Sequence, residues 1–132
     1  MLDLGCGDGA FLDDPANLEL LKGGDYLGVD VSRELIGKAS EKHCGPGRGF
    51  MTGNLSEREA FERILLAGGH RDCALTIFVI QEMPDLGSFL KHLGKVMKTG
   101  AFAFMVTVHP SFAEWLRDAG AMPVARELGE GG

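Results

Sequence analysis

Short apolar segments and amphipathic segments alternate along the chain, and groups of glycines separate them. The apolar segments, which we predict to be strands, are Met1–Leu4, Tyr26–Val31, Phe50–Thr52, Cys73–Ile80 and Ala101–Val108. The last two are almost continuously apolar instead of alternating with polar residues. This pattern is typical of strands that are buried on both faces, as in a parallel sheet covered by helices.

The segments between these strands carry the spacing of helices. The clearest apolar stripe follows the intervals i, i+3, i+4, i+7 and i+11 and consists of Leu86, Phe89, Leu90, Leu93 and Met97. Four shorter helices are predicted from Pro15 to Leu21, after the N-cap Ser32, after a capping box of Ser56 and Glu59, and along Phe112, Trp115, Leu116 and Ala119.

This alternation predicts one doubly wound α/β domain over residues 1–132, with a mainly parallel, Rossmann-like sheet of strand order 3-2-1-4-5 and helices on both faces. Ligands of such sheets bind outside the carboxyl ends of the strands, where the strand order reverses. We therefore expect a binding site between the first and fourth strands. The glycine-rich residues 129–132 are expected to form a disordered tail.

Composition excludes several classes of function. Thirteen Lys and Arg against nineteen Asp and Glu give a net charge of −6, which argues against a general nucleic-acid or anionic-membrane surface. The three cysteines are widely spaced and the histidines lack metal-site spacing, so we expect neither a disulfide framework nor a metal site. No apolar stretch approaches the roughly 18 residues of a membrane span. We expect a cytoplasmic protein.

The candidate chemistry centres on the glycine-rich loop Gly5–Gly9, which follows the first strand. Glycines there let the backbone approach a ligand closely and adopt positive φ angles without strain. A dinucleotide fingerprint can be placed on this loop, with Asp30 as its acid. However, Asp3 would then set a carboxylate against the incoming pyrophosphate. A ligand with a cationic end and an adenosine end suits the loop better.

Three segments resemble the class I S-adenosylmethionine-dependent methyltransferases. They are LDLGCGDG at 2–9, YLGVDVSRELIGKA at 26–39 and ALTIFVIQEMPDLGSFLKHLGKVMKTGAFAFMV at 74–106. The last holds Lys98-Thr99-Gly100-Ala101 where that family usually has Lys-Pro-Gly-Gly. The resemblance implies S-adenosyl-L-methionine as the cofactor. Members usually have a further helix before the first strand and two strands after the fifth, so the chain resembles a member truncated at both ends.

On the methionine side, the resemblance implies roles for four residues. Asp3 would orient the methionine ammonium, and Gly5, Cys6 and Gly7 would let the backbone pass beside the methionine moiety.

On the adenosine side, the resemblance implies that Asp30 accepts both ribose hydroxyls and that Val31 packs on the adenine. Asn54 and Leu55 follow the third strand, where the family often has an acid that reads the adenine amino group. Asn54 offers both an acceptor and a donor for that purpose.

Methyl transfer from a sulfonium is an in-line displacement that runs largely on positioning. A general base is needed only if the acceptor must lose a proton. Gln81 and Glu82 follow the fourth strand and His109 follows the fifth, so these three are the candidates for catalysis.

Three functions remain open. The leading hypothesis is S-adenosylmethionine-dependent methyl transfer to an unidentified acceptor, a small molecule. The alternatives are a non-catalytic S-adenosylmethionine-binding module or partner subunit, and an NAD(P)-binding Rossmann protein. The fifth strand would be a long apolar edge, which proteins ordinarily cover or pair. A homodimer or another partner covering that edge is therefore one interpretation, beside a fragment or a compact member of the family.

Overall fold

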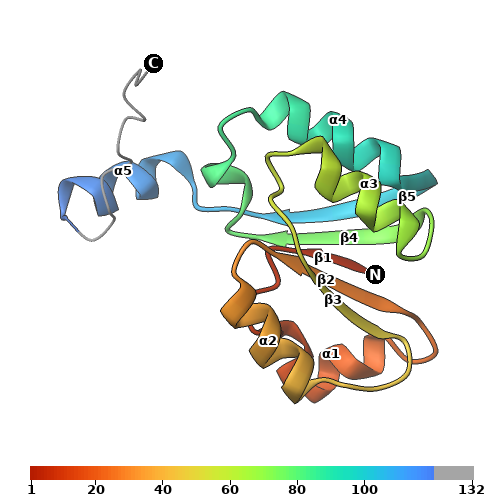
Figure 1. The fold of residues 1–132 in the computed structure, drawn as a ribbon. Coiled ribbons are helices and arrows are strands. Elements are labelled where there is room, and N and C mark those ends of the chain that lie inside the picture. Colours follow the sequence, from red (N-terminus) through yellow and green to blue (C-terminus); the bar gives the residue numbers. More distant parts are fainter. Residues whose placement is uncertain (121–132) are drawn as a thin grey trace.

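A computed structural model describes residues 1–120 and shows a parallel five-stranded sheet in the order β3-β2-β1-β4-β5 (Figure 1). The strands are β1 (Leu2–Leu4), β2 (Tyr26–Asp30), β3 (Arg48–Thr52), β4 (Arg71–Ile77) and β5 (Met97–Val106). The predicted strand order is confirmed. The predicted tail at 129–132 lies outside the described residues.

Helices cover both faces of this sheet. They are α1 (Pro15–Leu20), α2 (Arg33–Lys42), α3 (Arg58–Leu66), α4 (Leu86–Val96) and α5 (Pro110–Asp118), with short 3₁₀ turns at Ala10–Asp13 and Ile80–Glu82. Figure 1 shows α1 and α2 on one face of the sheet and α3 and α4 on the other, while α5 lies beyond the carboxyl end of β5. Within residues 1–120, no helix is long and apolar enough to span a membrane.

Two predicted helix starts have different outcomes. The Ser32 hydroxyl accepts a hydrogen bond from the Leu35 N–H at 3.3 Å, which confirms Ser32 as the N-cap of α2. The capping box of Ser56 and Glu59 was a wrong prediction, because α3 starts after Glu57. Instead, the Ser56 N–H donates to the Asn54 side-chain oxygen at 3.0 Å in the turn that precedes α3.

The larger hydrophobic core lies between the sheet and the helices α3 and α4. Phe89 and Leu93 from the predicted α4 stripe are buried in it, together with Val96. Leu90 is 42% exposed, so the buried stripe is narrower than predicted. A smaller core on the α1 face consists of Leu12, Leu21 and Tyr26, with Met1, Phe11 and Phe50 packed against it.

The two long apolar segments differ from their predicted form. β4 ends at Ile77, and Ile80 belongs to the following 3₁₀ turn. Burial is confirmed for the middle of β4, residues 74–76, but Phe102 and Phe104 of β5 are 57% and 62% exposed. The reason is that β5 is an edge strand, whereas α1 and α2 lie at the other edge of the sheet, where α2 contacts β2 and β3 (Figure 1). The apolar sequence of β5 therefore did not indicate a strand that is buried on both faces.

Two phenylalanine substitutions test this description of the core. Phe89→Ala is expected to lower the free energy of unfolding by about 3–5 kcal/mol, because Phe89 is only 2% exposed. Phe104→Ala is expected to lower it by about 1 kcal/mol or less, because most of its side chain already contacts solvent. Urea unfolding followed by circular dichroism measures both losses, and equal losses would contradict the assignment of β5 as an uncovered edge.

Candidate cofactor site

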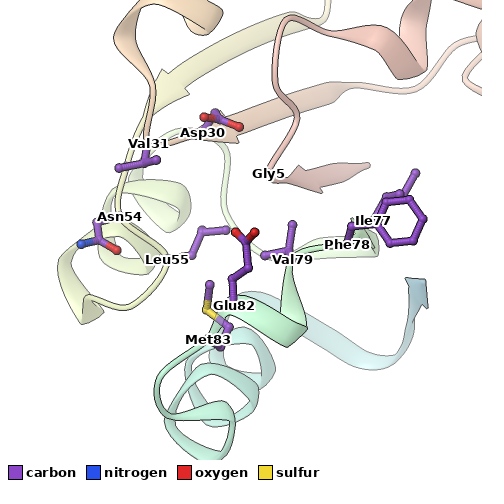
Figure 2. A pocket seen from close by; sticks show the side chains of 11 residues that line it. Gly5, Asp30, Val31, Asn54, Leu55, Ile77, Phe78, Val79, Glu82 and Met83 are labelled. Atoms are coloured by element: carbon purple, nitrogen blue, oxygen red, sulfur yellow. The ribbon is translucent and has the colours of Figure 1, made fainter. Parts of the chain in front are cut away.

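A cavity of about 310 Å³ opens at the carboxyl edge of the sheet, where the strand order reverses (Figure 2). It is lined by Gly5, Asp30, Val31, Gly53, Asn54, Leu55, Ile77, Phe78, Val79, Glu82 and Met83. These residues end or follow the strands β1, β2, β3 and β4. The cavity therefore lies where the sequence predicts a binding site.

The glycine loop has a backbone that only glycine adopts without strain. Gly5, Gly7 and Gly9 have φ angles of 78°, 57° and 85°, all in the left-handed region. A Cβ atom on Gly5 would also overlap the Val79 side chain. The Gly5 N–H donates to the Val29 carbonyl at 2.7 Å, which fixes the start of the loop against β2. At Gly5 the loop is thus both a turn and a close approach of the backbone to Val79, in the segment after β4.

Asp30 ends β2 and holds this loop through its side chain. One carboxylate oxygen accepts the Gly7 N–H at 2.9 Å, and the other accepts the Ser32 N–H at the start of α2, also at 2.9 Å. Each carboxylate oxygen has a second lone pair. Because Asp30 also lines the cavity, those lone pairs are available to hydroxyl donors from a ligand.

Asp3 lies in β1 and does not line the cavity. It is 5% exposed, and its carboxylate accepts a hydrogen bond from the Tyr26 hydroxyl at 2.5 Å. Burial raises the pKa of Asp3 to about 6; the Tyr26 hydrogen bond opposes this shift, and the charge of Asp30 adds to it. Burial, followed by the Asp3 charge, also raises the pKa of Tyr26. Sequence reasoning missed this partner of Asp3.

Cys6 is a packing residue of the loop. Its side chain is 7% exposed, and a Cβ atom on Gly28 of β2 would lie only 2.7 Å from its sulfur. Burial raises the pKa of the thiol to about 12, and the charges of Asp3 and Asp30 contribute to that shift. The thiol is therefore neutral at physiological pH. Cys6 does not line the cavity, and neither does Gly7, whose N–H binds Asp30 instead.

The four residues predicted for the adenosine side all line the cavity, and Figure 2 shows them on one side of it. Val31 is 68% exposed and Leu55 is 7% exposed, so together they offer an apolar surface. The Asn54 oxygen accepts the Ser56 N–H, and its amide nitrogen donates to Glu57 at 3.4 Å. The Asn54 amide is thus engaged in its own turn.

Of the three candidates for catalysis, the structure places only Glu82 in the lining of the cavity. Glu82 lines the cavity, and Figure 2 shows its carboxylate pointing toward the middle, between Leu55 and Val79. The Gln81 side-chain oxygen accepts the Thr107 hydroxyl at 2.7 Å, and His109 Nδ1 accepts the Ser111 N–H at 3.2 Å. Neither Gln81 nor His109 lines the cavity.

Sequence reasoning missed the apolar wall of the cavity, Ile77, Phe78, Val79 and Met83. Phe78 has a φ of 55°, a conformation found at no other non-glycine residue in the described part of the chain. Its N–H still donates to the Val106 carbonyl at 2.7 Å, so the chain bends immediately after its last pairing with β5. The apolar run 73–80 resembles one strand, and this bend has no signal within it.

Replacing Asp3 tests the assigned protonation state. The pKa of Asp3 lies above its ordinary value of 3.8, so between about pH 4 and 6 the folded protein binds this proton more tightly than the unfolded chain does. The associated stability is present below pH 4 and is lost as the pH rises through 6, an effect of about 3 kcal/mol.

Asp3→Asn keeps an acceptor for the Tyr26 hydroxyl but removes the titration. The variant is therefore expected to be more stable than the unchanged protein at pH 7, with a difference that shrinks toward pH 4. Urea unfolding at several pH values measures it. A constant difference between the two proteins across this range would contradict the burial of an ionisable Asp3.

Comparisons with known proteins identify a family for this sequence. The sequence matches the family described as methyltransferase domain over residues 2–103. A relative, the ubiquinone biosynthesis O-methyltransferase of Caulobacter vibrioides, is 31% identical over 111 residues, which are 83% of this chain and 40% of that protein. The chain thus spans less than half the length of this relative.

Solved structures share the fold. The plantazolicin methyltransferase BpumL in complex with SAH and a desmethylPZN analogue matches with a TM-score of 0.69 and 18% identity, over 94% of this chain and 44% of BpumL. An S-adenosylmethionine-dependent methyltransferase from Mesorhizobium loti matches with a TM-score of 0.63 and 21% identity, over 83% of this chain and 46% of its own. These likenesses confirm the predicted Rossmann-like architecture.

Proposed function

Because this chain belongs to the methyltransferase domain family, we propose that it binds S-adenosyl-L-methionine in the cavity between β1 and β4 and catalyses methyl transfer to a small-molecule acceptor. One observation carries this proposal. The Asp30 carboxylate both holds the glycine loop through the Gly7 N–H and lines the cavity at the carboxyl end of β2.

The lining residues fit an adenosine group and an amino-acid chain. Asp30 offers lone pairs to the ribose hydroxyls, and Val31 and Leu55 offer an apolar surface to the adenine. On the other side, Gly5 lines the cavity, so its backbone can lie beside the methionine moiety. Asp3 would contribute through the backbone or through water, because it does not line the cavity and its carboxylate is held by Tyr26.

The reaction depends chiefly on positioning. When bound, S-adenosylmethionine supplies a methyl group on an activated sulfonium. The chain's own contribution is to hold the reacting groups in line, which can lower a barrier by about 7–11 kcal/mol. The C. vibrioides relative is named an O-methyltransferase, which favours a hydroxyl acceptor. Of the three candidates for catalysis, Glu82 is the one that lines the cavity and can take the hydroxyl proton.

Asp30→Ala is expected to weaken cofactor binding by about 1.5–3 kcal/mol, or about 10- to 150-fold, because hydrogen bonds to a charged acceptor are lost. Calorimetric titration with S-adenosylmethionine and its product S-adenosylhomocysteine measures the change. Asp72→Ala is the matched control, since this exposed residue pairs with Lys98 at the opposite edge of the sheet. An unchanged affinity would contradict the binding of the ribose by Asp30. Failure of the folded protein to bind either ligand, or tighter binding of NAD, would refute the proposed function.

A second candidate is a cofactor-binding module that acts as a partner subunit without catalysis of its own. The exposed Phe102 and Phe104 on β5 favour it, because apolar edge strands are ordinarily covered. This candidate predicts cofactor binding without turnover and a stable oligomer in light scattering. A monomer that methylates an acceptor by itself would exclude it.

A further inference from the structure

The charge of the cavity is carried by two side chains. Of the eleven described residues that line it, only Asp30 and Glu82 have charged side chains, and both are acids. Among residues 1–120, no lysine, arginine or histidine lines the cavity. A pocket with this lining favours a positively charged ligand group over a neutral one.

The two acids are not equivalent. Both oxygens of Asp30 already accept backbone N–H groups, from Gly7 and Ser32. The carboxylate of Glu82 has no hydrogen-bond or ion-pair partner among residues 1–120, and Figure 2 shows it directed into the open space of the cavity. Glu82 is therefore the uncompensated charge of the site.

The backbone fixes the place of Glu82. It ends the 3₁₀ turn Ile80–Glu82, in which its N–H donates to the Val79 carbonyl at 3.0 Å. The preceding residue, Gln81, is tied to Thr107 in the segment after β5. The turn is thus anchored to the segment after β5, and Figure 2 shows the Glu82 side chain facing the cavity.

The position of Glu82 suits the sulfur of the cofactor, an argument that rests on the proposed function. Asp30, Val31 and Leu55 mark the adenosine end of the cavity, and Gly5 marks the methionine end. The sulfur joins the ribose to the methionine chain, so it belongs between these two ends. Figure 2 shows the Glu82 carboxylate pointing toward that middle region.

We propose that Glu82 is a specificity-determining residue that makes the site prefer the methyl donor over its product. S-adenosylmethionine and S-adenosylhomocysteine differ by one methyl group and one positive charge at sulfur. A carboxylate facing the sulfur stabilises only the charged form. The same charge that holds the donor therefore assists release of the product after transfer.

Calorimetric titration without any acceptor tests this role, because proton removal from an acceptor then plays no part. Glu82→Gln is expected to raise the dissociation constant of S-adenosylmethionine about three- to tenfold and to leave that of S-adenosylhomocysteine nearly unchanged. Asp30→Ala should weaken both ligands by similar factors, because both contain the ribose. Glu41→Gln, an exposed acid on α2 outside the cavity, should change neither.

A second measurement needs no variant. The preference of the unchanged protein for S-adenosylmethionine should fall as sodium chloride is raised, because salt screens a solvent-accessible charge. If Glu82→Gln weakens both ligands equally or neither, or if the preference is independent of salt, the role of Glu82 is refuted while the proposed function stands. If the unchanged protein binds neither ligand, the proposed function itself fails.

Discussion

The carboxylate of Asp30 joins the parts of the molecule that form the cavity. Through Gly7 it holds the glycine loop after β1, and through Ser32 it meets the start of α2. Both bonds depend on the parallel register of β1 and β2, in which Leu4 lies beside Val29 and the two strands end at one edge. A charged acceptor with two backbone donors is a strong local constraint. The Asp30 carboxylate thus fixes the shape of the loop and also makes this part of the cavity polar.

Asp3 illustrates a cost of this arrangement. Its carboxyl group is buried, with Tyr26 as its hydrogen-bond partner, and burial raises its pKa. An ionisable group in such a place lowers stability at neutral pH, and an amide would fit the same hydrogen bond. A costly residue in β1, the strand that leads into the glycine loop, indicates a functional requirement. The thiol of Cys6 lies in the same layer and adds packing without charge.

Much of the fold could be predicted from local sequence signals, and the failures have identifiable causes. The alternation of strands and helices predicted the strand order, and Ser32 predicted the start of α2. Both predictions rest on patterns of residues that are close together in the sequence. The exposure of Phe104 and the inward position of Asp3 depend on what distant segments cover, which a single sequence does not reveal. The bend at Phe78 is likewise set by tertiary contacts and places Val79 against the loop. For the same reason, the lining residues Asp30, Val31, Asn54 and Leu55 were easier to predict than the apolar wall of the cavity.

The central claim is that the cavity beside Asp30 holds the nucleoside part of S-adenosylmethionine. A crystal structure of the protein soaked with S-adenosylhomocysteine tests it most directly. The account predicts the ribose hydroxyls within hydrogen-bonding distance of the Asp30 carboxylate and the adenine against Val31 and Leu55. A nucleoside bound elsewhere, or an Asp30 side chain turned away from the sugar, would contradict it.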